Sequence, residues 1–171
     1  TADVEVHPII DSTNSELMRR IQAKTALESG TVIVAEMQQA GRGRRGRVWQ
    51  SPFGANLYYS YFWRLDDGLQ AAMGVSIAVG LAVYDAIKAL YQVEVELKWP
   101  NDIYINKQKL AGVLVELDGQ PQGPCQLVIG IGINLQMPES FSQHIDQAWT
   151  DLNQHTQKLD KNQLVASLTH H

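Results

Sequence analysis

A short run rich in arginine and glycine limits how this chain can fold. Four arginines and three glycines occur within the seven residues from Gly41 to Arg47, although the whole chain carries a formal net charge of −4. The run lies between two segments, 31–35 and 56–63, whose β-branched and aromatic residues predict strands. Arginine side chains match carboxylate and phosphate groups, and glycines let backbone N–H groups approach an anion. We therefore expect an ordered loop that folds over a small anionic ligand.

The composition is that of one globular domain. The chain has 171 residues, of which 44% are hydrophobic and 19% charged, so it can bury a core and is unlike a disordered chain. A pI near 5.7 argues against a general nucleic-acid coat protein. A single cysteine excludes an intrachain disulfide and fits a reducing cytoplasm. The longest uncharged run, 68–84, is shorter than the roughly 20 apolar residues of a bilayer span, so we expect no membrane association.

The order of the predicted elements favours an α/β (α+β) domain with a mixed, largely antiparallel sheet backed by helices. The predicted strands cover residues 4–10, 31–35, 56–63, 93–97, 103–105, 110–117 and 126–135. A first helix opens after Asp11, with Thr13 and Glu16 spaced as a capping box. A second, over about 70–91, is apolar on nearly every side and should be buried. A third helix begins at Asp160.

Polar residues interrupt the second half of this pattern. Trp99-Pro100-Asn101-Asp102 breaks a strand, because proline cannot continue a ladder, and the oxygens of Asn101 and Asp102 suit a hard cation. Lys109 begins the following strand, where an isolated lysine is usually a solvated end residue. Gly130-Ile131-Gly132-Ile133-Asn134 lacks the third glycine and the following helix of a dinucleotide fingerprint. Its small residues would instead let a ligand approach the sheet.

Five motifs, in this order along the chain, resemble those of biotin–protein ligase. They are Asp11-Ser12-Thr13-Asn14, Gly41 to Arg47, Lys98 to Asp102, Lys109 to Glu116 and Gly130 to Asn134. The resemblance covers nearly the whole chain and implies the fold shared with lipoate ligases and class II tRNA synthetases. It also implies a two-step reaction. Biotin and ATP, with Mg²⁺ assisting, would give biotinyl-5′-AMP and pyrophosphate, and a lysine of a biotin carboxyl carrier protein would then accept biotin and release AMP.

The resemblance also implies which residues bind biotin and catalyse. Four side chains would hydrogen-bond the ureido head of biotin: Ser12, Thr13, Asn14 and Gln38. Arg42 and Gly43 would offer backbone donors, and Trp49 would pack over the closed loop on the biotin side. Arg44 would contact the carboxylate or the adenylate phosphate and retain the intermediate. Lys109 would bridge the carboxylate and the α-phosphate, so Arg44 and Lys109 are the predicted catalytic residues.

A second set of residues would serve the nucleotide. Four would bind ATP and its magnesium, with Asp102 as the metal ligand: Arg47, Asn101, Asp102 and Asn134. Trp149 would stack on the adenine. The resemblance therefore predicts two neighbouring subsites that share the reacting carboxylate and phosphate.

Residues 1–171 would form the catalytic domain alone. The N-terminal helix-turn-helix of some family members would be absent, so we expect no DNA binding, and the small C-terminal β-domain would be absent or truncated. A homodimer through a sheet edge, at the strand around Glu96 or at the following hairpin, remains open. Two alternatives also remain, a lipoate–protein ligase of the same fold and a non-catalytic anion- or RNA-binding module. Biotin binding distinguishes the first, and pyrophosphate release that needs both biotin and ATP distinguishes the second.

Overall fold

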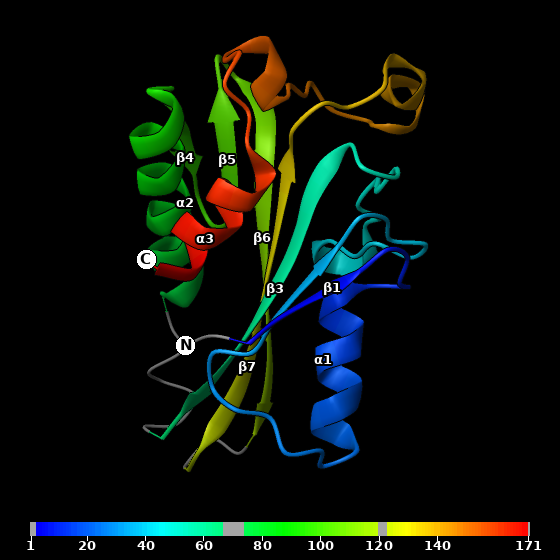
Figure 1. Ribbon diagram of the computed structural model, residues 1–171, viewed down its shortest axis with the longest axis vertical. Coiled ribbons are helices and arrows are strands. Elements are labelled where there is room, and N and C mark those ends of the chain that lie inside the picture. Colours follow the sequence, from blue (N-terminus) through cyan, green and yellow to red (C-terminus); the bar gives the residue numbers. More distant parts are fainter. Residues whose placement is uncertain (1–2, 67–73, 120–122, 171) are drawn as a thin grey trace.

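A single seven-stranded sheet forms the centre of the computed structural model, which describes residues 3–66, 74–119 and 123–170. The strands are β1 (Val4–His7), β2 (Val32–Ala35), β3 (Asn56–Leu65), β4 (Glu96–Lys98), β5 (Asp102–Ile105), β6 (Gln108–Gly119) and β7 (Cys125–Asn134). Their order across the sheet is β1-β2-β3-β7-β6-β5-β4 (Figure 1). β1 and β2 pair in parallel, and each of the other neighbouring pairs is antiparallel. The predicted mixed, largely antiparallel sheet is confirmed.

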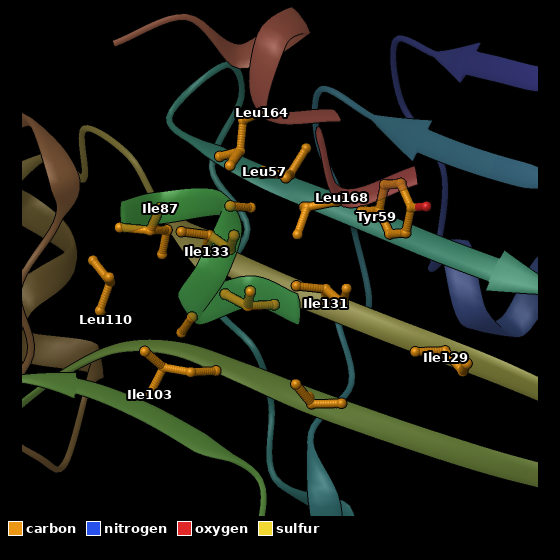
Figure 2. Close-up of a cluster of buried hydrophobic side chains, with 14 of the residues drawn as sticks. Leu57, Tyr59, Ile87, Ile103, Leu110, Ile129, Ile131, Ile133, Leu164 and Leu168 are labelled. Atoms are coloured by element: carbon orange, nitrogen blue, oxygen red, sulfur yellow. The ribbon is translucent and has the colours of Figure 1, made fainter. Parts of the chain in front are cut away.

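Helices cover both faces of this sheet. On one face, α1 (Thr13–Gln22) buries Leu17 and Ile21 against side chains of β2, β3 and β7. On the other face, α2 (Val75–Tyr91) and α3 (Lys161–His170) pack on the larger core (Figure 1). Figure 2 shows this core, in which Ile87 of α2 and Leu164 of α3 lie near β3 and β7. Each fully buried aliphatic side chain contributes about 1.5–3 kcal/mol to folding, so the larger core fixes the sheet that carries the site.

The second helix, predicted to be buried because it is apolar on nearly every side, is buried only along the stripe that faces the sheet. Val83 and Ile87 are fully buried, but Ile77 and Leu81 are 47% and 49% exposed. A helix that lies on one outer face of a sheet can bury only the stripe that faces the sheet. The predicted start of this helix near residue 70 lies outside the described residues, and the described helix begins at Val75. None of the helices in the described ranges is long and apolar enough to cross a membrane.

The first helix is capped one residue earlier than predicted. Ser12 is the N-cap, and its Oγ accepts a hydrogen bond from the Ser15 N–H at 3.4 Å. Glu16 pairs with Arg19 and Arg20 and does not complete a capping box with Thr13. Thr13, as the first helical residue, therefore has its side chain free to contact the sheet.

Two predicted connections are confirmed. β5 and β6 form a hairpin whose turn residues, Asn106 and Lys107, have φ values of 49° and 65°, as a type I′ turn requires. The Trp-Pro-Asn segment separates β4 from β5 and contains a cis peptide bond between Trp99 and Pro100. The strand predicted at 93–97 begins later, because β4 comprises Glu96–Lys98.

Candidate functional site

The candidate site lies on one face of the three central strands, β3, β7 and β6. Residues that lie side by side across these strands form two rows: Tyr58, Gly132 and Gly112 in the first, and Ser60, Gly130 and Leu114 in the second. Alternate residues of a strand point to the same face, so both rows face α1 and the loop that follows β2. Three of the six positions are glycines, which leaves space above the sheet for side chains from other segments.

Asn14 and Trp49 fill the space above these glycines. A Cβ atom on Gly130 would come within 2.3 Å of the Asn14 side chain, and one on Gly132 within 2.5 Å of the Trp49 indole. Such distances are too short for any side chain larger than hydrogen. The glycines thus admit two of the predicted binding residues. They also line the cavity described below, and approach of a ligand to them stays a prediction.

A cavity of about 330 Å³ opens beside these rows, between α1, the arginine loop (Gly41–Arg47) and β5 to β7. Most of the predicted site residues line it: Ser12, Thr13, Asn14, Gln38, Arg42, Gly43, Arg44, Arg47, Trp49, Asn101, Asp102 and Lys109. The other two predicted residues, Asn134 and Trp149, line a second cavity of about 620 Å³. The fold thus gathers residues from distant parts of the sequence around two cavities.

Lys109 lies where the two cavities meet. It lines both of them, together with residues 47–49 and Gln147. Its Nζ lies 2.9 Å from Asp102 Oδ1, and its side chain is only 13% exposed. The same atom lies 5.5 Å from the centre of the Trp49 ring. Lys109 is therefore not a solvated strand end, and its ammonium group can reach an anion in either cavity.

A buried network of hydrogen bonds joins α1 to β3 and to the loop after β2. Gln38 Oε1 accepts from the Thr13 N–H at 2.9 Å, and Gln38 Nε2 donates to Ser51 Oγ at 3.1 Å. The Ser60 hydroxyl bonds to the Thr13 hydroxyl at 2.7 Å and donates to Asn14 Oδ1. Thr13, Asn14 and Ser60 are at most 4% exposed. A satisfied buried network of this kind holds its polar side chains in fixed orientations.

The arginine loop lies over the first cavity and is held by its own backbone hydrogen bonds. The Gly43 N–H donates to the Arg47 carbonyl at 2.8 Å, and the Trp49 N–H donates to the Gly41 carbonyl at 2.9 Å. Two side chains tie the loop to the sheet. Arg42 pairs with Glu116 on β6, and Arg44 Nη1 donates to Asn101 Oδ1 at 2.9 Å.

Asn134, the last residue of β7, and Trp149, which forms a β-bridge with Lys109, both lie beside the start of β6. The Lys109 N–H donates to the Ala148 carbonyl at 2.9 Å, and the Thr150 N–H donates to the Lys109 carbonyl at 3.0 Å. Asn134 Nδ2 donates to the Thr150 carbonyl at 3.0 Å. Residues 148–150 are therefore attached directly to the strand that carries Lys109. Asn134 supports this attachment, and its contact with a nucleotide stays a prediction.

The acidic groups near Lys109 suit a metal ion only if a ligand supplies further oxygens. Within residues 3–66, 74–119 and 123–170, no three His, Cys, Asp or Glu side chains are grouped as a metal site. Asp102 is paired with Lys109, and Asn101 Oδ1 accepts from Arg44. Magnesium in nucleotide enzymes is commonly held by one or two carboxylates and by phosphate oxygens. Asp102 fits this mode of binding.

Sequence reasoning missed two polar residues of the site. Ser60 lies within an aromatic strand and belongs to no motif, and Glu116 ends a motif without an assigned role. Both contact Asn14, Ser60 through Oδ1 and Glu116 through Nδ2 at 3.0 Å. Their alternation with apolar neighbours on the strands is the signal that could have placed them on the α1 face.

The fold and the site together define a domain with two cavities that meet at one lysine, beneath a cationic loop. Residues 6–134 match the biotin/lipoate A/B protein ligase family. The chain belongs to this family, which confirms the resemblance seen in its five motifs.

Individual relatives agree with this membership. The chain is 48% identical over 165 residues to the bifunctional ligase/repressor BirA of Escherichia coli (strain K12), an alignment that covers 96% of the chain and 50% of BirA. It is 41% identical over 133 residues to the biotin–[acetyl-CoA-carboxylase] ligase of Mycobacterium tuberculosis, covering 75% of the chain and 48% of that protein. The chain thus spans about half the length of the curated relatives it matches.

A solved structure confirms the fold class. The biotin protein ligase from Aquifex aeolicus in complex with biotin and ATP matches with a TM-score of 0.81 at 29% identity. The match covers 99% of this chain and 68% of that chain. The ligase from Leishmania major in complex with biotinyl-5-AMP matches with a TM-score of 0.78 at 27% identity, covering 98% and 72%.

Proposed function

We propose that this chain is the catalytic domain of a biotin–protein ligase, which adenylates biotin with ATP and transfers it to a lysine of a biotin carboxyl carrier protein. The observation that carries the proposal is the position of Lys109, whose ammonium group lies where two cavities meet. The relatives support the biotin branch over the lipoate branch, because the named relatives above are biotin ligases. A non-catalytic binding module has no need for a second cavity at the same lysine.

The first cavity would hold biotin. Its polar end is built from the side chains that the resemblance assigns to the ureido head, the buried Ser12, Thr13 and Asn14 and the half-buried Gln38. Thr13 and Asn14 are fixed by Ser60, so a bound ureido group would meet donors and acceptors that are already oriented. The carboxylate would point toward Lys109 and the backbone N–H group of Arg42, and the Gly43 N–H would join them only by leaving the Arg47 carbonyl to which it donates in the structure.

The second cavity would hold ATP. Trp149 would stack on the adenine, and Arg47 lines both cavities and would contact the phosphates. A biotin carboxylate oxygen would attack the α-phosphorus, and the bond to the leaving pyrophosphate would break. The two reactants repel each other, and preorganised positive charge from Lys109 and Arg44 would offset that repulsion. Magnesium, held by Asp102 with support from Asn101, would neutralise further charge on the phosphates.

The arginine loop would protect the intermediate. Biotinyl-5′-AMP is a mixed anhydride that water hydrolyses, so a closed loop that excludes water preserves it. The ε-amino group of the carrier lysine would then attack the biotinyl carbonyl, form an amide, and release AMP. Arg44 reaches Asn101 across the cavity mouth and would retain the adenylate until the carrier protein arrives.

Location and assembly follow as further parts of the proposal. The reaction consumes ATP, and we place it in the cytoplasm. The sheet has two edges, β1 and β4, and a homodimer would join either one of them. Size-exclusion chromatography with light scattering would detect the dimer, and a monomer at high concentration would refute the proposed dimer.

The test is pyrophosphate release by the purified chain. Release should occur with biotin and ATP together and should stop when either is omitted. Isothermal titration in parallel should show binding of biotin and none of lipoate. Release with lipoate in place of biotin would identify a lipoate ligase, and neither binding nor release with either acid would overturn the proposal.

A further inference from the structure

Glu116 lies outside the set of residues proposed to touch substrate, yet it connects two parts of the site. It lies on β6 opposite Val128 of β7, one row further from Lys109 than Leu114 and on the same face. Its side chain is 19% exposed, whereas Asp118, two residues further along the same face of β6, is an exposed residue. Glu116 is therefore a half-buried carboxylate at the end of the polar network that begins at Gln38.

Both oxygens of this carboxylate have partners. Arg42 Nη2 donates to Oε1 at 2.6 Å, and Arg42 Nη1 donates to Oε2 at 3.1 Å. Asn14 Nδ2 donates to the same Oε2 at 3.0 Å. One carboxylate thus joins the arginine loop, through a two-pronged ion pair, to the first turn of α1.

The contact to Asn14 fixes the orientation of that amide. Nδ2 faces Glu116, and Oδ1 accepts from the Ser60 hydroxyl. Without the carboxylate, the nitrogen would keep only the longer bond to the Leu114 carbonyl at 3.4 Å. Asn14 is 4% exposed and sits directly on Gly130, so a misoriented amide there has little water to compensate for a lost partner.

We propose that Glu116 is a positioning residue that couples closure of the arginine loop to the orientation of Asn14 in the biotin site. Opening of the loop separates Arg42 from Glu116 and leaves the carboxylate with Asn14 and solvent. Because coupling between two sites is reciprocal, a ligand that holds Asn14 in its present orientation favours the closed loop. The link to biotin rests on the proposed function. The ion pair between Arg42 and Glu116, which we call the latch, does not depend on that function.

The latch is tested without any ligand, by limited trypsin digestion. The loop contains its own cleavage sites, at Arg44, Arg45 and Arg47. Glu116→Ala, Glu116→Gln and Arg42→Ala should each raise the rate of cleavage within the loop by about fivefold to tenfold, equal to about 1–1.4 kcal/mol. Asp118→Asn, on the same strand face, should leave the rate unchanged. Cleavage of the Glu116 variants at the rate of Asp118→Asn would overturn the latch.

A double-mutant cycle tests whether the two residues act together. The double variant Arg42→Ala/Glu116→Ala should be cleaved about as fast as Arg42→Ala, which removes the pair with Glu116 and also the bond from Arg42 Nη1 to Ser15 Oγ at 3.3 Å. Multiplication of the two single effects would show that the residues act independently, and would also overturn the latch. Urea unfolding of each variant shows whether faster cleavage comes from the loop or from global unfolding.

The coupling to Asn14 is tested by a comparison of two substitutions at one position. Glutamine keeps an oxygen that accepts from Asn14, whereas alanine removes it. The KM for biotin should therefore rise about tenfold in Glu116→Ala and much less in Glu116→Gln, with a smaller change in kcat in both. Equal KM values for the two variants would refute the coupling. If neither the wild-type chain nor any variant uses biotin, the proposed function fails. The trypsin digestion still shows whether the latch holds the loop closed.

Discussion

Replacement of Lys109 by methionine is the most direct test of how the site works. Methionine keeps an unbranched side chain but removes the ammonium group that lies 2.9 Å from Asp102. Loss of one preorganised charge at a water-excluded site costs about 10²–10³ in rate, or about 2.7–4 kcal/mol of transition-state stabilisation. The adenylation rate at saturating biotin and ATP should fall by that factor.

The same substitution affects stability less than activity. Exposed ion pairs contribute about 0.2–1 kcal/mol, and loss of one partner of a fully buried pair costs about 3–5 kcal/mol. The Lys109 and Asp102 side chains are 13% and 23% exposed, so Asp102 can regain water and we expect a loss of about 1–2 kcal/mol. Such a loss leaves an ordinary domain folded.

The assay is release of pyrophosphate by Lys109→Met, with Lys107→Met as the control. Lys107 lies two residues away, at the exposed tip of the same hairpin, and its substitution should leave the rate within about twofold, because it removes a charge from solvent. Urea unfolding gives the stability of both variants. A folded Lys109→Met chain that keeps more than a tenth of the wild-type rate would refute the role assigned to this ammonium group.

Three further predictions follow from other contacts. Arg44→Gly removes the bond to Asn101 and should leave adenylate synthesis while raising its escape, seen as biotinylation of bystander lysines; an unchanged rate of adenylate dissociation would contradict this. Gly132→Ala should displace the Trp49 indole, which lies 2.5 Å from the added carbon, at a cost of about 1–3 kcal/mol; an unchanged tryptophan emission spectrum and unfolding midpoint would count against the packing described. Hydrogen bonds from Arg20 hold the pKa of Glu5 below its ordinary value, so the stabilisation is complete above about pH 4.3 and is lost as the pH falls through the folded-state pKa. Glu5→Gln should therefore cost about 0.5–1 kcal/mol at pH 7 and almost nothing in strong acid, and a cost independent of pH would refute this linkage.

Local patterns predicted the sheet better than they predicted the surroundings of the helices. β-branched and aromatic runs, together with the Asn106–Lys107 turn, define strands whose pairing is largely antiparallel. The hydrophobic composition of the second helix does not reveal which of its faces another element covers. The exposure of Ile77 and Leu81 could therefore not be predicted from the sequence. At the first helix, Ser12 and Thr13 are both good capping residues. Ser12 is the N-cap, and Glu16 pairs with Arg19 and Arg20 instead of completing a capping box with Thr13.

The contacts within the site depend on strand register, which the sequence does not specify at this distance. Gly130 lies opposite Leu114 on the preceding strand of the chain, but its place beside Ser60 depends on pairing of β3 with β7, which are 70 residues apart at this position. That register determines which side chain covers each glycine, Asn14 over Gly130 and Trp49 over Gly132. The motifs predicted which residues gather at the site, but the hydrogen bonds among them needed the structure.

The four arginines of the loop divide into two pairs that differ in their side-chain contacts. Arg42 and Arg44 bind partners on the protein, Glu116 and Asn101. Arg45 and Arg47 also line the first cavity, and their guanidinium groups make no hydrogen bond or ion pair to any described residue. A loop whose charges were all paired could close but could offer nothing to a phosphate, and one whose charges were all free would repel itself and stay open. All four arginines line the first cavity, so under the proposed function the two that contact the protein would hold the loop closed while the other two guanidinium groups stay available to a phosphate.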